Sequence, residues 1–580
     1  WVELHGYFRV RPDMIDNGHL GQSARTELAS QKVLTTSAIK PPLSLWPANN
    51  EQSSFKKVGK SREDKVIAGT TMRLRLCPTI HLHDRIRIKM TVDAFDNYLM
   101  GASPDYAGSL ERPDVPLVAF STSSVPGALR VHEAYGEWQT PVGVVRVGRQ
   151  SSHWGLGILA NGGMGTTWDG GRPIDQYYGG ALLPHAGSGY DADYGNFVDR
   201  AAFLTRLKGV YVATFWDFVS QGAIGYDPAR IDGVPLDMDQ SDDVDQFGIA
   251  IFQKPLSDGD QRKRRADLVD AGVGTLDWGL YGVFRKQEHD TAKFIPNGGD
   301  SEVVPGQLTI AHGEKLSLIP RDAWAAIGDL WLRYERRLSF EERIVIEAEA
   351  AYLHGHIGDA NAEVNVGGSA REKDIAMWGG AIKAAWQKAG LGVYLDGGVA
   401  SGDKNRCFGV RTDDKNCSLS DFKGNADAEL TGFRFHRNYR VDSLLFREVI
   451  GAVTNAWYLK PTISINAHPF YSLGDQLGLD VSLLHAGAMN IEGTPGYGST
   501  LGTEFEARGF LGIKGLLLAS VSFAYMVPGD ALDVLGPGAD RPDNCGLDAA
   551  SGDGCRWLGA ITGAEAENAW RLMTRLALMF

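Results

Sequence analysis

Residues 569–580 read AWRLMTRLALMF, a run in which apolar side chains fall on every second position. One face of an extended chain would carry Trp570, Leu572, Leu576, Leu578 and Phe580, and the other face would carry Arg571 and Arg575. A period of two is typical of a β-strand with one apolar face. Soluble proteins rarely end on such a face, so we expect this strand to close a sheet that is surrounded by lipid.

The same alternation runs through the rest of the chain. It is clearest in VELHGYFRVR (2–11), TMRLRLCPTIHL (71–82) and RIRIKMTVDA (85–94). A tilted strand needs about 9–11 residues to span a bilayer, more than the usual soluble strand. We predict about 18 such strands, near residues 2–11, 69–82, 85–98, 128–139, 144–150, 196–207, 209–219, 243–254, 276–288, 327–337, 342–357, 372–388, 391–401, 448–466, 473–489, 499–512, 515–528 and 566–580.

The connections between these strands alternate in length. Short turns such as His83-Asp84 and Ala389-Gly390 alternate with long connections at 12–68, 99–127, 151–195, 289–326, 402–447 and 529–565. Short periplasmic turns and long extracellular loops are typical of transmembrane barrels. The sequence therefore predicts an all-β fold in which residues 1–580 form a single closed antiparallel transmembrane β-barrel. Residues 255–275 are too long for a turn, so we expect a periplasmic insertion there, either a small helix or a docking site.

Composition excludes several classes of protein. The 580 residues carry a formal charge of −13, which argues against nucleic acid as a partner. No run of eighteen apolar residues and no signal peptide occurs, so we interpret the sequence as a mature chain. No dinucleotide or phosphate-loop motif appears, and we expect no cofactor.

The cysteines form two local pairs in polar loops. Cys407 and Cys417 lie in 402–447, and Cys545 and Cys555 lie in 529–565. We expect two short-loop disulfides, which indicate an oxidising compartment, and the alternative of a zinc site has no histidine nearby. The fifth, Cys77, lies in a predicted strand.

If the apolar faces meet lipid, the polar faces line a lumen that is rich in basic residues on neighbouring strands. The candidate pore-lining and solute-contact residues are Arg9, Arg11, Arg73, Arg75, Arg85, Arg87, Lys89, Arg130, Arg146, Arg571 and Arg575. The facing wall would mix acids with arginines, at Asp329, Arg333, Glu335, Arg337, Arg343, Glu347 and Glu349. Such an arrangement suits a basic track for an anionic solute. It equally suits opposite charges that satisfy one another on adjacent strands.

The connection at 151–195 is rich in glycine and aromatic residues and nearly uncharged. We interpret it as a loop that folds into the barrel and constricts it, with an outer cap as the alternative. Its candidate constriction residues are His153, Trp154, Trp168, Asp169, Arg172 and Asp175.

Two other functional patterns are weak. Asp237, Asp239, Asp242 and Asp243 are dense enough to attract calcium, but they lack the spacing of an EF-hand loop, so a solvated acidic loop is favoured and no metal site is predicted. No Ser/His/Asp arrangement stands out, and we expect a protein that is not an enzyme, with a barrel hydrolase as the less favoured alternative.

Residues 131–157, VHEAYGEWQTPVGVVRVGRQSSHWGLG, resemble a motif of large bacterial porins of the alginate-export and phosphate-selective type. The whole chain also resembles outer-membrane barrels of myxobacteria and related delta-proteobacteria, and its last strand is similar to the C-terminal signal of bacterial outer-membrane barrels. This resemblance implies 18 strands and a basic lumen for a polyanion, with Arg73, Arg75, Arg85, Arg87, Arg130 and Arg146 as the residues that contact the solute.

These observations predict a porin in the cell outer membrane of a Gram-negative bacterium, surrounded by lipid and lipopolysaccharide. It would pass hydrophilic solutes, either saccharides or anionic oligomers and polymers. The alternative is a plugged structural or docking barrel that serves adhesion or binds a periplasmic or lipoprotein partner. The sequence leaves the oligomeric state open.

Overall fold

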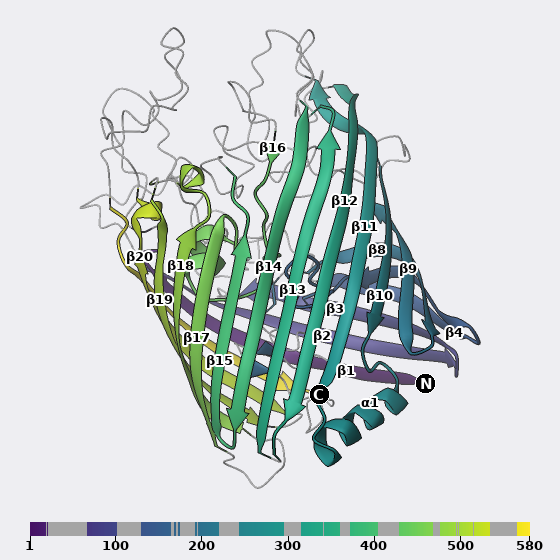
Figure 1. Cartoon of the computed structure of the whole chain (residues 1–580), viewed down its shortest axis with the longest axis horizontal. Helices are drawn as coiled ribbons and strands as arrows, with labels where there is room; N and C mark the ends of the chain where they lie inside the picture. The colour runs from purple at the N-terminus through teal and green to yellow at the C-terminus, as the bar shows by residue number, and fades with distance from the viewer. Residues whose placement is uncertain are drawn as a thin grey trace, which may run out of the picture.

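The fold was analysed in a computed structural model of the chain. It describes residues 1–18, 20, 66–100, 129–163, 168–169, 172–173, 192–193, 195–219, 243–294, 315–339, 341–359, 372–403, 429–467, 476–494, 496, 498–513, 516–533 and 565–580. Eighteen strands in these ranges form one continuous antiparallel wall (Figure 1). They are β1 (Val2–Asp16), β2 (Val66–His83), β3 (Ile86–Leu99), β4 (Leu129–Thr140), β5 (Gly143–Ser151), β8 (Phe197–Leu207), β9 (Val210–Val219), β10 (Val244–Gln253), β11 (Thr275–Phe294), β12 (Lys315–Arg337), β13 (Glu342–Ile357), β14 (Lys373–Lys388), β15 (Leu391–Ala400), β17 (Ala456–Ala467), β18 (Gln476–Ala488), β19 (Thr500–Ile513), β20 (Leu517–Pro528) and β21 (Ala569–Met579).

The first and last strands close the barrel. β1 pairs with β21 from Tyr7 opposite Met579 to Asp16 opposite Trp570. Beyond the strand, the Gly6 N–H donates to the Phe580 carbonyl at 3.0 Å. Because lipid offers no hydrogen-bond partner for an open sheet edge, this pairing satisfies the backbone groups that both strands would otherwise expose. The predicted closed barrel of about 18 strands is confirmed.

The two faces of each strand differ in chemistry. On β18, Leu477, Leu479 and Leu483 point outward and are exposed, whereas Asp480 and Ser482 point inward and are buried. Large aromatic side chains mark both ends of the outward face, with Trp138 close to the turn that follows β4 and Trp457 close to the start of β17. An apolar belt between aromatic girdles is the surface of a transmembrane barrel. The protein is therefore an outer-membrane barrel.

Tight turns connect the strands at one end. Lys208 and Gly209, between β8 and β9, have φ angles of 49° and 90°. Two consecutive left-handed residues match the two-residue hairpin turns that follow the twist of the strands. The chain termini lie at the same end (Figure 1), so this is the periplasmic end of the barrel.

A small helical element lies in the predicted insertion at 255–275. It comprises α1 (Asp258–Arg265) and η3 (Ala266–Asp270), and Ser257 caps its first turn by accepting from the Asp260 N–H at 3.2 Å. Arg264 donates to Asp277 and Leu268 is fully buried, so the element is fixed to the periplasmic ends of the strands. Its predicted role in docking a partner stays a prediction. None of the helices in the described ranges is long and apolar enough to cross a membrane.

The remaining described elements are short: β6 (Trp168–Asp169), β7 (Arg172–Pro173), β16 (Glu429–Leu430), η4 (Leu445–Ile450), η5 (Ile491–Gly493) and η6 (Asp530–Leu532). One of them corrects a predicted strand boundary. We expected a strand from residue 448, but residues 445–450 form the helical turn η4 and β17 begins only at Ala456. The run LFREVI has apolar residues at 445, 446, 449 and 450, a spacing without a period of two, and all four of these side chains are buried inside the barrel. A strand there would turn half of them away from this interior.

The lipid-facing belt gives the first testable expectation. Leu395, in the middle of β15, and Leu391, at its periplasmic end, both point outward with 43% and 42% of their surface exposed. Arginine on the lipid face costs about 2–4 kcal/mol at the bilayer midplane and about 0–1 kcal/mol near the interfaces. Leu395→Arg should therefore lower the free energy of unfolding in liposomes much more than Leu391→Arg. Equal losses from the two variants would contradict this placement in the membrane.

Candidate functional site

Two chain segments lie inside the barrel between its walls. The first inner segment, residues 152–163, follows β5 and docks against the lumen face of β11, β12 and β13. The Trp154 ring stacks on Tyr281 with centroids 5.2 Å apart, and its indole N–H donates to Asp329 at 3.1 Å. The Gly157 N–H donates to Glu349 at 2.9 Å. The first inner segment is thus held by an aromatic contact and by two carboxylates of the wall.

The second inner segment, residues 431–455, joins β16 to β17. It places Phe433, Phe435, Leu444, Leu445 and Ile450 in the largest buried apolar cluster of the described residues. The barrel contributes Val345, Tyr394, Tyr458 and Leu484 to the same cluster from its inner face. A cavity inside an 18-stranded barrel is wider than side chains alone can fill, so a segment of chain supplies the missing apolar volume.

Buried polar groups anchor the second inner segment. The Glu504 carboxylate on β19 accepts from the backbone N–H groups of Ser443 and Leu445, both at 2.9 Å, and of Leu444 at 3.2 Å. Asp442 accepts from the Phe446 N–H at 2.8 Å. These carboxylates satisfy the unpaired donors at the start of η4, which would be costly to bury alone.

Arg571 on β21 fixes the same segment from the other side. Its guanidinium donates to the Ser443 carbonyl at 2.7 Å and to Glu448 at 2.6 Å, and it also pairs with Asp13 on β1. Arg571 is 2% exposed. Arg571 therefore joins β1 and β21, the two strands that close the barrel, to the second inner segment.

The two inner segments meet in the lumen. The His436 backbone N–H donates to the Ile158 carbonyl at 2.7 Å, and the Asn438 side-chain amide donates to the side-chain Oδ1 of Asn161 at 3.2 Å. His436 Nδ1 accepts from the Asn438 N–H at 3.0 Å, and His153 Nδ1 accepts from the Gly162 N–H at 3.4 Å. Both imidazoles therefore need an unprotonated Nδ1 in the docked arrangement.

Desolvation inside the barrel lowers the pKa of both histidines from an ordinary value of 6.5 to about 4, although the His153 ring is exposed to the lumen and His436 is half-buried. Lys254 lowers the pKa of His153 further, and the pKa of His436 is further lowered by His153 and by Arg437 and Arg434. Both side chains are consequently neutral at pH 7.

The predicted basic wall contains a buried arginine cluster. Asp193, just before β8, accepts from Arg11 on β1 at 3.0 Å and from Arg440 of the second inner segment at 2.9 Å. Arg9 and Arg73 lie 3.7 Å from the same carboxylate. Burial by itself would raise the pKa of Asp193, but the four guanidinium groups hold it well below its ordinary range.

Two further groups of charges extend this wall toward the periplasm. Arg75 forms a salt bridge with Asp93 at 2.5 Å, and His132 lies 2.9 Å from the same carboxylate. Closer to the turns, Glu137 accepts from Arg87 at 2.6 Å and from Arg146 at 2.8 Å. The side chains of Arg87 and Arg146 keep 32% and 41% of their surface exposed, so they face the water of the lumen.

The facing wall is more acidic. Arg333 pairs with Glu347 at 2.5 Å and lies 3.6 Å from Glu335, while Arg343 lies 3.9 Å from Glu335. Asp329 and Glu349 hold the first inner segment, as described above. All seven residues predicted for this wall are buried on the inner face: Asp329, Arg333, Glu335, Arg337, Arg343, Glu347 and Glu349.

The other predicted site residues are distributed as follows. Arg575 is buried on β21, Lys89 is half-buried on β3, Arg130 is exposed at the start of β4, and Arg85 lies in the exposed turn after β2. Trp168, Asp169 and Arg172 lie in the paired strands β6 and β7, whose side chains are outside the described residues, as is Asp175. Solute contact by any of these residues stays a prediction.

Several loop predictions cannot be compared with the structure. Cys407, Cys417, Cys545 and Cys555 lie outside the described residues, as do Asp237, Asp239 and Asp242, whereas Asp243 is described and half-buried. Within the described ranges, no group of acidic, histidine or cysteine side chains is arranged to hold a metal ion. Cys77 on β2 is a free thiol. The two disulfides therefore stay predictions.

The second inner segment is what sequence reasoning missed. We expected residues 402–447 to form an extracellular loop, yet residues 431–447 lie inside the barrel. The signal was present in the run FRFHRNYRVDSLLF at 433–446, which holds more large apolar side chains than a solvated loop normally carries. The same reasoning had predicted the inward course of the connection at 151–195.

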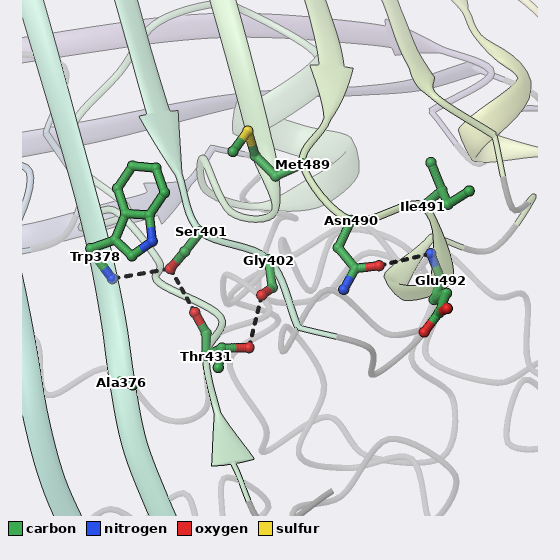
Figure 2. Close-up of a pocket in the computed structure, with 9 residues that line it drawn as sticks. All are labelled: Ala376, Trp378, Ser401, Gly402, Thr431, Met489, Asn490, Ile491 and Glu492. Carbon is green, nitrogen blue, oxygen red and sulfur yellow. Dashed lines mark hydrogen bonds between the residues drawn. The ribbon is translucent and has the colours of Figure 1, made fainter.

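A pocket of about 450 Å³ lies on the wall at the extracellular end, between β14 and the connection from β18 to β19 (Figure 2). Its floor is tied together by the Ser401 hydroxyl, which accepts from the Trp378 N–H at 3.0 Å and donates to the Thr431 carbonyl at 2.6 Å. Trp378 and Ile491 leave 43% and 48% of their surface exposed around it. None of the charged lumen residues named above lines this pocket.

No family model and no curated protein matches the chain. Similar solved structures include OprD from Pseudomonas aeruginosa, at 9% identity and a TM-score of 0.41 over 100% of this chain and 94% of that chain. A BenF-like porin from Pseudomonas fluorescens Pf-5 gives 9% and 0.40 over 100% and 99%, and OmpT of Vibrio cholerae gives 8% and 0.32 over 100% and 97%. Likeness at these values carries no argument about function. The resemblance to alginate-export and phosphate-selective porins is not confirmed and stays a prediction.

The anchoring carboxylate can be tested directly. Glu504→Ala leaves three buried N–H donors without an acceptor, at about 1–3 kcal/mol for each group. Amide hydrogen exchange of residues 441–450 should accelerate and the free energy of unfolding should fall, whereas Glu492→Ala, at an exposed glutamate in η5, should change neither. Unchanged exchange in Glu504→Ala would show that the second inner segment is held by other contacts.

The contact between the inner segments should weaken in acid. The folded-state pKa values of His153 and His436, about 4, lie below the ordinary value of 6.5, so the undocked state binds more protons between these limits. The stabilisation is complete above pH 6.5 and is lost as the pH falls toward 4. Hydrogen exchange of residues 431–439, corrected for intrinsic rates, should be faster at pH 5 than at pH 7. Equal protection at both values would argue against neutral docked histidines.

Proposed function

We propose that this barrel is an outer-membrane channel for the passive passage of hydrophilic solutes, with a preference for anions. The observation that carries the proposal is the concentration of inward-facing guanidinium groups on β1 to β5, where Arg9, Arg11 and Arg73 share one carboxylate with Arg440 of the second inner segment. Eighteen-stranded barrels are wide enough to leave a water-filled channel. A lumen wall with excess positive charge concentrates anions and repels cations.

The inner segments shape this path without removing it. They dock on the acidic wall and on the closing strands through Asp329, Glu349, Glu504 and Arg571. Arg87 and Arg146 lie near the periplasmic end and face the lumen water. Solutes would therefore pass along the arginine side of the lumen, beside the inner segments. The proposal involves transport only and requires no covalent chemistry or cofactor.

Planar-bilayer conductance tests the proposal. Purified protein should give steady open-channel steps, and the reversal potential in a salt gradient should show anion preference. Replacing both Arg87 and Arg146 with Gln removes two cations from the lumen wall and leaves Lys89 as the remaining cation near the buried Glu137 carboxylate. A fixed unit charge a few ångströms away changes the energy of a passing ion in water by about 1 kcal/mol. The anion-to-cation permeability ratio should therefore fall by several-fold.

The matched control is Arg336→Gln, which removes an exposed arginine from the outward face of β12 near the same end of the barrel. This variant should keep the selectivity of the original protein. A cation-selective channel, or equal effects of the two replacements, would contradict the role of the arginine wall. Silence of every variant would favour the plugged docking barrel.

A further inference from the structure

The Asp193 cluster, defined as Asp193 with Arg9, Arg11, Arg73 and Arg440, is assembled from separate parts of the chain. Arg9 and Arg11 come from β1, Arg73 from β2, and Arg440 from the second inner segment. The carboxylate does not come from the barrel wall, because Asp193 lies in the chain that leads into β8. Four guanidinium groups held by the fold thus surround one carboxylate, that of Asp193, which lies in the chain segment before β8.

The geometry is that of a binding site for an oxyanion. Arg11 and Arg440 approach the carboxylate at 3.0 and 2.9 Å, and Arg73 also donates to the Ala192 carbonyl at 2.6 Å. Guanidinium groups present paired donors that match carboxylate and phosphate oxygens. Arg9 and Arg73 are 0% and 1% exposed, and buried guanidinium groups require nearby acceptors. Arg73 also lies 3.3 Å from Asp93, and Arg9 also donates to Asn97, so Asp193 is one of several acceptors around these two groups.

The cluster is within reach of solvent. The side chains of Arg11, Arg440 and Asp193 keep 10%, 11% and 11% of their surface exposed, while Arg9 and Arg73 form the buried floor. A small oxyanion could therefore approach from the side of Arg11 and Arg440. It would meet the same donors that now hold Asp193.

We propose that the Asp193 cluster is an oxyanion-binding subsite that the chain's own carboxylate occupies in competition with the solute. The inference rests on the proposed passage of anions through the lumen. Beyond that proposal, the inference names the chemistry of the ligand, a carboxylate or phosphate group. It also names Asp193 as the residue that limits the affinity of the subsite for this ligand. A tethered competitor keeps binding weak enough for release, which a conducting path requires.

The competition has a measurable consequence. For a ligand that must displace an internal competitor, the apparent dissociation constant equals the intrinsic dissociation constant divided by the fraction of vacant sites. Asp193→Asn removes the competing charge and leaves the four guanidinium groups in place. Inorganic phosphate, used as the probe, should then bind at least about tenfold more tightly than to the original protein.

The experiment follows unfolding of the full-length barrel in detergent, in sodium phosphate and in sodium chloride of equal ionic strength. Asp193→Asn should be stabilised by phosphate at lower concentrations than the original protein. The matched control is Asp199→Asn, at an exposed aspartate on β8 that pairs with Arg149. It should respond to phosphate as the original protein does. Adding Arg440→Gln to Asp193→Asn should weaken phosphate binding again.

Each possible result either supports or overturns the proposal. Phosphate affinity of Asp193→Asn no higher than that of Asp199→Asn would overturn it. If Asp193→Asn fails to refold in chloride, recovery of folded barrel in phosphate supports the subsite, and equal failure in both salts overturns it. The assay is independent of conductance. Tighter phosphate binding without any current would contradict the channel alone, and an anion current without the phosphate effect would contradict the subsite alone.

Discussion

The structure depends on one constraint, which is that backbone groups in lipid must find hydrogen-bond partners within the protein. Pairing of β1 with β21 removes the last open edge of the wall. Closure then fixes the alternation of side chains, so that apolar groups face lipid and polar groups face the lumen. The charges that accumulate inside must be paired there, and the lumen walls and inner segments are organised around those pairs.

The lumen is electrostatically divided. Arginines dominate the side of β1 to β5, whereas carboxylates on β13 and β19 accept backbone N–H groups from the inner segments, and Asp329 on β12 accepts the Trp154 indole N–H. Placing the inner segments against the acidic side satisfies donors that the segments themselves leave unpaired. On the arginine side, Arg87 and Arg146 face the lumen water, whereas Arg9 and Arg73 are buried. The different charges of the two walls thus account both for the docking of the inner segments inside the barrel and for the proposed preference for anions.

Much of the fold could be predicted from sequence because lipid imposes a strict period of two. All 18 barrel strands were located, although β11 and β12 extend beyond the predicted 276–288 and 327–337. The second inner segment was missed because a buried irregular segment has no period to detect. The contacts within the site could not be predicted from sequence either. Arg440 lies 247 residues from Asp193, and nothing in the local sequence of either residue indicates their contact. Sequence could propose a basic wall, but not which arginines hold the inner segments and which face water.

The central claim is that the two inner segments meet inside the barrel, and cross-linking tests it most directly. Asn161 and Asn438 approach each other at 3.2 Å in the lumen. With both replaced by cysteine and Cys77 by serine, the account predicts rapid formation of a disulfide in the folded barrel in native membranes. A second pair, with cysteines at Asn161 and at Asn490 of the connection between β18 and β19, should stay reduced. Equal or absent cross-linking in both pairs would contradict the account.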